Sequence, residues 1–486
     1  CKPFTESLFI MVYPEISADA LSQAIHSKQV SCREVMQITL NQIAKHNPQS
    51  NALVSLADED DLLRQADERD AQLARGQSMG WMHGMPQAIK DLSNVAGFRT
   101  TLGSPLMRDV VASEDGLMAS RMKASGCIVI GKTNTPELGL GSHTFNEVFG
   151  ATRNAWDASK TAGGSSGGAA VALAQRMLPV ADGSDFMGSL RNPAGWNHIF
   201  GLRPSQGRVP KWPEQDVWIA QMGTEGPMGR SVRDVAMLLS VQAGQHPAAP
   251  LSIAQDGQAF TAPLDSEVQG QRIGWLGDLN GYLPMEEGVM ATCQLALKSL
   301  ETMGCHTEEA ALGMAPEKVW DAWLVWRQAL TGPRVAPLMR KPENHHLVKP
   351  EARWEYEQSL QLTGAQLMSA SAARSRFYQQ MLQLFERFDV LAIPAAQVWP
   401  FEIGERWPKQ INGQTMDTYH RWMEVVIYAT LAGLPCISVP AGFGPNGLPM
   451  GLQLIGKPQG DFALLQLAHA YEQANVDMIR LRPPGV

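Results

Sequence analysis

The sequence predicts an α/β fold, from its composition and from stretches in which strand-like and helical segments alternate. With 44% hydrophobic and 18% charged residues, the chain has the composition of a folded globular protein. Between Trp81 and Pro210, short apolar runs alternate with glycine-rich turns and helical stretches, as in an α/β core. The clearest segments are strand-like at 127–130 and 178–181, helix-like at 169–175, and strand-and-turn at 388–400 and 433–456.

The N-terminal part is predicted to open with a helical hairpin over residues 18–46. Ser17 or Asp19 can cap the first helix. Ser31, followed three residues later by Glu34, has the spacing of a capping box for the second helix.

Helical patterns dominate two further regions. Residues 57–75 are charged and alanine-rich, which indicates a surface helix. Residues 285–385 come after a loop predicted at 245–265, and they carry a cluster of tryptophans. Three of these tryptophans recur at every third position: Trp320, Trp323 and Trp326. We therefore expect them on one helix face, packing mainly within the helical layer.

Charge and cysteine content exclude several classes of function. The net charge is 40 − 48 = −8, which argues against a nucleic-acid binder and against a polybasic membrane patch. No apolar run approaches the ~18 residues that a membrane span needs. The six cysteines contain no CxxC pair, so we expect neither a disulfide framework nor a zinc site. We therefore expect a reducing compartment, the cytoplasm. Small molecules are the expected partners.

The first residues are expected to be an extension rather than part of the fold. Residues 8–13 are apolar, but Pro14 and Glu15 follow without the small residues of a cleavage site, which disfavours a signal peptide. We expect an extension over residues 1–16, of which the first ten precede a natural start at Met11.

The densest motif is Thr161–Gly168, TAGGSSGG, which an alanine-rich helix follows at once. A flexible linker is disfavoured by that helix. A phosphate loop is disfavoured because Lys160 precedes the glycines instead of following them. Gly163-x-Ser165-x-Gly167 fits the nucleophile elbow of α/β-hydrolases, but the polar residues before it do not resemble the strand that such an elbow needs.

Two further motifs supply polar groups. In Gly183–Pro193, GSDFMGSLRNP, Ser189 follows a glycine at an apparent strand-to-helix turn, where consecutive backbone N–H groups can surround an oxyanion. The alternative is that Ser189 only caps a helix. In Gly84–Asp91, GMPQAIKD, Lys90 ends an apolar stretch. This lysine is a candidate functional residue only if the fold brings it into contact with the serines.

Together these three motifs resemble the amidase signature family. Its pattern is a G-x-P-x-x-x-K-D segment, then GGSSGG, then G-[ST]-D-x-x-G-S-[IL]-R-x-P, and this chain has each of them in order. Lys90 precedes Ser165 by 75 residues, and Ser189 follows it by 24. Blocks at 131–134, 201–204, 226–230, 434–440 and 447–453 extend the resemblance over roughly residues 20–475.

The resemblance implies a fold and a domain organisation. The fold is α/β, with a central mixed twisted β-sheet that helices cover on both faces. Residues 17–486 form one domain, with a core at 80–240 and 388–475 and a divergent helical region on the substrate side at about 250–387. No metal or organic cofactor is implied. Relatives are often dimers, so a homodimer is left open.

The resemblance also implies the catalytic groups. Ser189 is the nucleophile, Ser165 relays the proton, and a neutral Lys90 is the base, which requires burial to lower its pKa by several units from ~10.4. The Gly164–Ser165 bond is cis in relatives. The oxyanion is held by the N–H groups of Phe186, Met187, Gly188 and Ser189. Asp185 and Arg191 are expected to form a structural ion pair.

One departure from the family pattern indicates the substrate. Phe186 and Met187 stand where the family has small residues, which makes the pocket apolar and suits aryl groups. We therefore expect an aryl acylamidase or urethanase-like enzyme for amides, carbamates and esters. Further substrate contacts are expected from Gly164, Trp320, Tyr419 and Trp422.

Three alternatives remain. A glutamine-hydrolysing, ammonia-supplying component of an amidotransferase would need polar anchors for its substrate. A binding protein on the same scaffold would need no catalytic groups, although this chain retains all three. A histidine-dependent α/β-hydrolase would need an essential histidine, and His198 is the nearest in sequence to Ser189.

Overall fold

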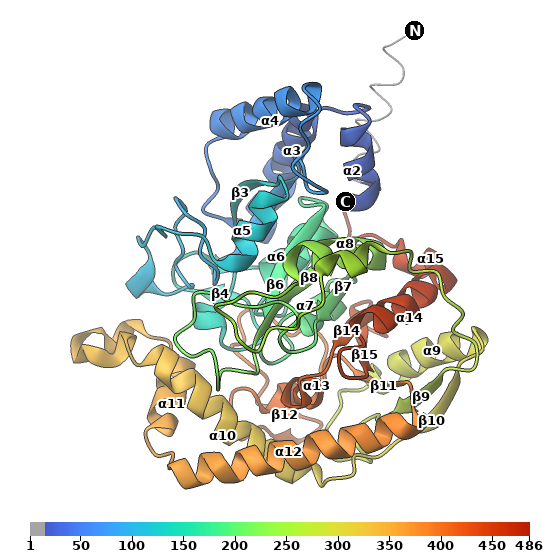
Figure 1. Cartoon of the computed structure of the whole chain (residues 1–486). Coiled ribbons are helices and arrows are strands. Elements are labelled where there is room, and N and C mark those ends of the chain that lie inside the picture. Colours follow the sequence, from blue (N-terminus) through green and yellow to red (C-terminus); the bar gives the residue numbers. More distant parts are fainter. Residues whose placement is uncertain (1–14) are drawn as a thin grey trace.

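An eight-stranded mixed sheet forms the centre of the protein in this computed structural model, which describes residues 15–486 (Figure 1). The strand order is β10-β9-β11-β15-β14-β7-β8-β6. The three strands at one edge run parallel, and all the other neighbours pair antiparallel. The strands are β6 (Val180–Asp185), β7 (Phe200–Arg203), β8 (Thr224–Gly229), β9 (Arg272–Trp275), β10 (His306–Glu309), β11 (Val390–Pro394), β14 (Cys436–Phe443) and β15 (Pro449–Gly456).

A second, three-stranded sheet adjoins the free edge of β6. Its order is β1-β3-β2, with β2 parallel to β3, and β2 lies against β6 without pairing with it in the backbone. The strands are β1 (Leu53–Val54), β2 (Pro86–Lys90) and β3 (Ile128–Thr133). The short hairpins are β4 (Phe145–Asn146) with β5 (Gly150–Ala151), and β12 (Gln410–Ile411) with β13 (Gln414–Thr415). The contact of β2 with β6 brings two distant parts of the chain together.

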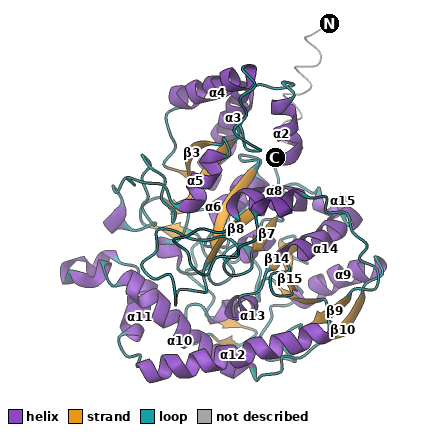
Figure 2. Cartoon of the chain, in the orientation of Figure 1, coloured by secondary structure: helices purple, strands orange, loops and turns teal. Residues whose placement is uncertain are grey.

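Helices cover both faces of the large sheet, so the predicted α/β fold is confirmed (Figure 2). α8 (Val232–Gln242), α9 (Val289–Thr302) and α14 (Asp461–Ala474) pack on β7, β8, β14 and β15, and α14 contacts both α8 and α9. The remaining helices near the sheets are α5 (Leu117–Ala124), α6 (Gly167–Ala174), α7 (Arg191–Trp196), α13 (Ile427–Ala432) and α15 (Val476–Ile479).

The N-terminal helices follow the predicted caps. The helices are α2 (Ala18–His26), α3 (Cys32–Ser50) and α4 (Glu59–Ala74). The Ser17 side chain accepts a hydrogen bond from the backbone N–H of Ala20, and Ser31 with Glu34 forms the capping box. The extension predicted to precede Met11 lies outside the described residues.

The helical region predicted at 285–385 divides in two: α9 packs on the large sheet, and the helices after it form a layer along one side of the molecule, far from α2–α4 (Figure 1). This layer consists of α10 (Pro316–Val335), α11 (Pro350–Ser359) and α12 (Gly364–Arg387), and both α11 and α12 pack on α10. All three tryptophans of α10 are buried. The prediction missed β10 within this region, because a short and largely exposed edge strand has no apolar pattern.

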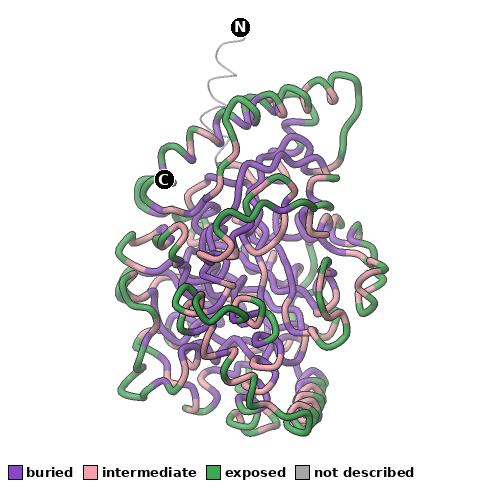
Figure 3. Tube along the Cα trace, turned by 90° about the vertical axis from the view of Figure 1, so that its left-hand side faces the viewer, coloured by how far each residue is buried: buried purple, intermediate pink, exposed green. Residues whose placement is uncertain are grey.

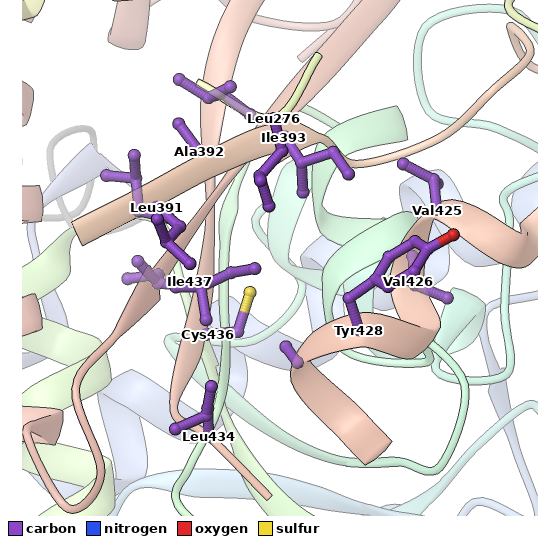
Figure 4. Close-up of a cluster of buried hydrophobic side chains, with 14 of the residues drawn as sticks. Leu276, Leu391, Ala392, Ile393, Val425, Val426, Tyr428, Leu434, Cys436 and Ile437 are labelled. Carbon is purple, nitrogen blue, oxygen red and sulfur yellow. The ribbon is translucent and has the colours of Figure 1, made fainter. Parts of the chain in front are cut away.

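Buried residues fill the centre of the molecule, and exposed ones lie on its outer turns and helices (Figure 3). One part of the core joins β11 and β14 to α13, and it contains Ile393, Ile437, Tyr428 and Val426 (Figure 4). Val426 is buried in this cluster. No helix of the described residues is long and apolar enough to cross a membrane.

Candidate active site

Lys90 lies at the last position of β2 and points into a group of hydroxyls. The residue is 1% exposed. The Nζ atom lies 2.8 Å from Ser165 Oγ, 2.8 Å from Ser166 Oγ and 3.1 Å from Ser184 Oγ. The contact of β2 with β6 therefore joins the lysine to both serine-bearing segments.

The surroundings of Lys90 favour its neutral form. Burial lowers the pKa of Lys90 to about 7, although the carboxylates of Asp182, Asp185 and Glu225 act in the opposite direction. Asp182 Oδ2 accepts a hydrogen bond of 3.1 Å from the backbone N–H of Lys90 and so fixes the end of β2 to β6. Burial also raises the pKa of Asp182 to about 6.

Ser165 follows a backbone segment that two hydroxyls hold just before the expected cis bond. The Gly164–Ser165 peptide is cis. Ser142 Oγ accepts from Gly164 N–H at 3.2 Å and donates to Gly164 O at 2.7 Å, and Thr144 Oγ1 donates to Gly163 O at 2.8 Å. Both backbone groups of Gly164 are therefore hydrogen-bonded within the protein. Gly164, which was predicted to contact the substrate, does not line the larger cavity described below.

Ser189 lies in the loop between the end of β6 and the start of α7, and it is 7% exposed. Asp185 closes this loop. Its carboxylate accepts from Gly188 N–H at 3.0 Å and Leu190 N–H at 3.1 Å, and it pairs with Arg191 at 2.9 Å. Burial alone would raise the pKa of Asp185, but Arg191 and Arg203 hold it well below its usual value. The expected ion pair is thus present, with a second arginine added.

Gly188 is required in this loop for two reasons. Its φ is +78°, and a Cβ atom built on it would lie 2.8 Å from both methyl groups of Val426. Its N–H already donates to Asp185. The N–H groups of Phe186, Met187 and Ser189 donate to no other residue that the structure describes, so three of the four predicted oxyanion donors are free for a substrate.

A cavity of about 650 Å³ joins these elements, and both Ser165 and Ser189 line it. Phe186 and Met187 line it too, and they pack against α10. The Phe186 ring centre lies 5.6 Å from that of Trp323 and 5.7 Å from Arg327 Cζ. Arg327 Nη1 lies 3.8 Å from Met187 Sδ. The two bulky side chains therefore form part of the wall beside the serines, as predicted from their place in the loop.

The three aromatic residues predicted to contact substrate lie behind this wall. Tyr419 and Trp422 line a separate, much smaller cavity, and Trp320 lines neither. Tyr419 OH accepts from Arg327 at 2.5 Å and donates to Glu355 at 2.7 Å. Trp422 stacks on Trp196 with ring centres 5.9 Å apart. Tyr419 thus supports the arginine that faces the larger cavity.

Several polar residues of the site were missed by the sequence analysis. Ser166 and Ser184 both contact Lys90, and their places inside the two serine motifs were the available indication. Glu225 immediately precedes the block 226–230, and it is an acid in an otherwise uncharged strand. Arg327 is hidden among the tryptophans of its helix, and no pattern distinguished it.

No histidine takes the place that the α/β-hydrolase alternative requires. All eleven histidines are among the described residues, and none lines the larger cavity. The His198 ring hydrogen-bonds to Met478 O at 2.9 Å and packs on Trp156 and Phe443. Burial lowers its pKa to about 4. His198 is therefore a neutral, structural side chain that contacts the C-terminal part of the chain.

Comparison with known proteins decides the family. A family model described as Amidase matches residues 34–465. This chain belongs to the amidase signature family. The family shows that it is a hydrolase of C–N amide bonds with small-molecule amides as substrates. A bacterial aryl acylamidase of the family has a solved structure with a TM-score of 0.88 and 30% identity, over 96% of this chain and 99% of that one.

Curated relatives within the family differ in their activities. A glutamyl-tRNA(Gln) amidotransferase component from Synechococcus sp. (strain JA-3-3Ab) is 32% identical over 485 residues, 96% of this chain and 93% of its own length. The acylamidase of Rhodococcus erythropolis is 30% identical over 466 residues, 94% of this chain and 95% of its own length. Members of the family with similar identity to this chain therefore carry different activities.

The rate of amide hydrolysis is expected to rise with pH through the ionisation of Lys90. A lysine accepts a proton only when neutral, and burial lowers the pKa of Lys90 to about 7, so kcat/KM should increase through about pH 7 and level off above it. Asp182→Asn removes a charge that raises this pKa, so the midpoint should move to lower pH. Profiles of kcat/KM for the two proteins check this; a midpoint that stays or moves upward contradicts it.

Gly188→Ala is expected to reduce kcat by at least about tenfold, because the new methyl group must displace Val426 or the catalytic loop. Gly76→Ala is the matched control: its φ is +73°, yet no atom lies within 4 Å of the added Cβ. Both variants place alanine at a positive φ, but only Gly188→Ala also brings its methyl group against Val426. Steady-state kinetics, with circular dichroism to confirm folding, separate the two; equal losses would refute the role of the collision.

Proposed function

We propose that the protein hydrolyses apolar, mainly aryl, amides, and carbamates and esters as well, through an acyl-enzyme on Ser189. The observation that carries this is the contact of a buried, low-pKa lysine with a serine in the wall of a cavity that a second serine shares. Phe186, Met187 and several leucines give part of that wall an apolar surface. The similarity to an aryl acylamidase over nearly the whole chain adds support.

The first half of the reaction begins at Lys90. Its neutral amine takes the proton of Ser165 Oγ, at 2.8 Å, as Ser165 takes the proton of Ser189 Oγ. Ser189 Oγ then bonds to the carbonyl carbon, and the carbonyl oxygen becomes an oxyanion. The free N–H groups of Phe186, Met187 and Ser189 stabilise that charge.

The leaving group departs when the proton returns along the same path. Ser165 donates a proton to the leaving nitrogen and regains one from the Lys90 ammonium, and the C–N bond breaks. Water then attacks the acyl-enzyme with the same relay as base, and releases the acid. Ser166 and Ser184 hold Nζ aimed at Ser165 throughout, because they occupy its remaining hydrogen-bonding positions.

The apolar wall favours aromatic substrates. Phe186 offers a ring beside the serines, and Met187 and several leucines of the cavity wall add apolar surface. An anilide or an aryl carbamate also has a better leaving group than an alkyl amide, so one site can serve both.

A glutaminase role within an amidotransferase is the second candidate, because of the 32% identity to an amidotransferase component. Glutamine carries a carboxylate and an ammonium group, which need separate polar anchors. Purified protein that releases ammonia from glutamine, but leaves anilides intact, would favour this candidate over the first.

Ser189→Ala is expected to lower kcat for an anilide by at least about a thousandfold, since no other group can form the acyl-enzyme. A fluorophosphonate probe should label Ser189 in the native chain, and Lys90→Ala should remove the labelling. Ser252→Ala, at another serine of the cavity wall, is the matched control and should keep it. Peptide mass spectrometry locates the adduct; an adduct on Ser165 would contradict the assigned roles.

A further inference from the structure

A buried carboxylate that the reaction does not use forms part of the cavity wall beside the serines. Glu225 is the second residue of β8, is 4% exposed, and lines the same cavity as Ser165 and Ser189. Its Oε1 accepts a hydrogen bond of 2.7 Å from Ser93 Oγ. Among the described residues, no group donates a hydrogen bond to its second oxygen.

The sheet register places this carboxylate next to the catalytic base. Glu225 lies directly opposite Ser184 in the antiparallel pair of β8 and β6, and directly opposite residues project to the same face. Ser184 Oγ in turn contacts Lys90 Nζ at 3.1 Å. The next pair in the register joins Thr224 to Asp185, where the oxyanion loop begins. A substrate bound at Ser189 therefore occupies the same cavity as Glu225.

Glu225 differs from two other acids near the cavity in having no cationic partner. Glu214 pairs with Lys211 at 2.7 Å and Arg334 at 3.2 Å, and Glu355 pairs with Arg327 at 2.5 Å. No lysine, arginine or histidine of residues 15–486 lies within ion-pair distance of Glu225. Burial raises the pKa of its carboxyl, with Lys211 and Ser93 acting in the opposite direction.

Burying a carboxylate without a partner costs free energy. A ligand that supplies the missing hydrogen-bond donor recovers that free energy when it binds. An amino or ammonium group provides such a donor, with a charge opposite to that of the acid. The apolar surface of Phe186 and Met187 lies in the wall of the same cavity and suits an aromatic ring. The cavity thus combines a ring-binding surface with a buried carboxylate that has no cationic partner among the described residues.

We propose that Glu225 is a specificity-determining residue that accepts a hydrogen bond from an amino or ammonium group on the substrate. This proposal rests on the proposed function and narrows it: the preferred substrates are aryl amides or carbamates whose ring carries a second, basic nitrogen. Such a molecule places its scissile bond at Ser189 and its free nitrogen at Glu225.

Two acetanilides of nearly equal size test the assignment, one with a 4-aminomethyl group and one with a 4-ethyl group. The ratio of their kcat/KM values near pH 8 should favour the aminomethyl compound about tenfold or more in the native chain. Glu225→Gln should reduce that ratio to near one, while Glu225→Asp should retain part of it. Glu214→Gln, at a paired carboxylate of the same cavity, should leave the ratio high.

Calorimetric binding of both compounds to Ser189→Ala separates this proposal from the proposed function. If neither compound is cleaved by the native chain, yet the aminomethyl compound binds tighter and Glu225→Gln in the same background removes the difference, the aryl-amide function fails and the Glu225 assignment stands. Cleavage of both at equal rates, with no difference in binding, overturns the assignment alone. Equal losses for both compounds in Glu225→Gln, with a shifted pH midpoint, would also overturn it, because Glu225 would then act through Lys90.

Discussion

Burial of one ammonium group among three hydroxyls is the constraint on which the rest of the structure depends. No carboxylate of residues 15–486 contacts Lys90 Nζ, which is surrounded by the hydroxyls of Ser165, Ser166 and Ser184 and by a more distant carbonyl. Hydroxyls accept from an ammonium and equally donate to an amine, so they tolerate both protonation states, whereas a contacting acid would fix the charged one. The pKa of about 7 follows from burial among such neighbours.

The same requirement explains where the nearby acids are engaged. Asp182 binds the backbone of Lys90 rather than its side chain, and Asp185 is neutralised by Arg191 and Arg203. Each acid thus fixes a catalytic segment without pairing with the base. Arg191 also donates to the carbonyl of Val426, whose methyl groups face Gly188, so one ion pair connects the oxyanion loop to the core cluster of Figure 4.

Local sequence patterns predicted the fold class, the caps at Ser17 and Ser31, and the segments that hold the lysine and both serines. These features depend on neighbours in the chain or on contiguous motifs. The partners of Lys90 beyond Ser165 and the lone carboxylate of Glu225 depend on the approach of β2 to β6 and on the register of β8. Spacing along the chain encodes neither, although Ser166 and Ser184 lie inside the two serine motifs.

The helical layer supports the chemistry as well as the substrate. Arg327 of α10 is fixed by Glu355 and Tyr419, and it contacts both Phe186 and Met187. Those two residues provide the apolar wall through their side chains and the free oxyanion donors through their backbone N–H groups. In the proposed mechanism, substrate selection and transition-state stabilisation therefore share one loop, which Asp185 holds on the side of the sheet and α10 holds on the side of the helical layer. Substitutions in α10 can therefore change the substrate preference only if they leave the backbone N–H groups of Phe186 and Met187 in position.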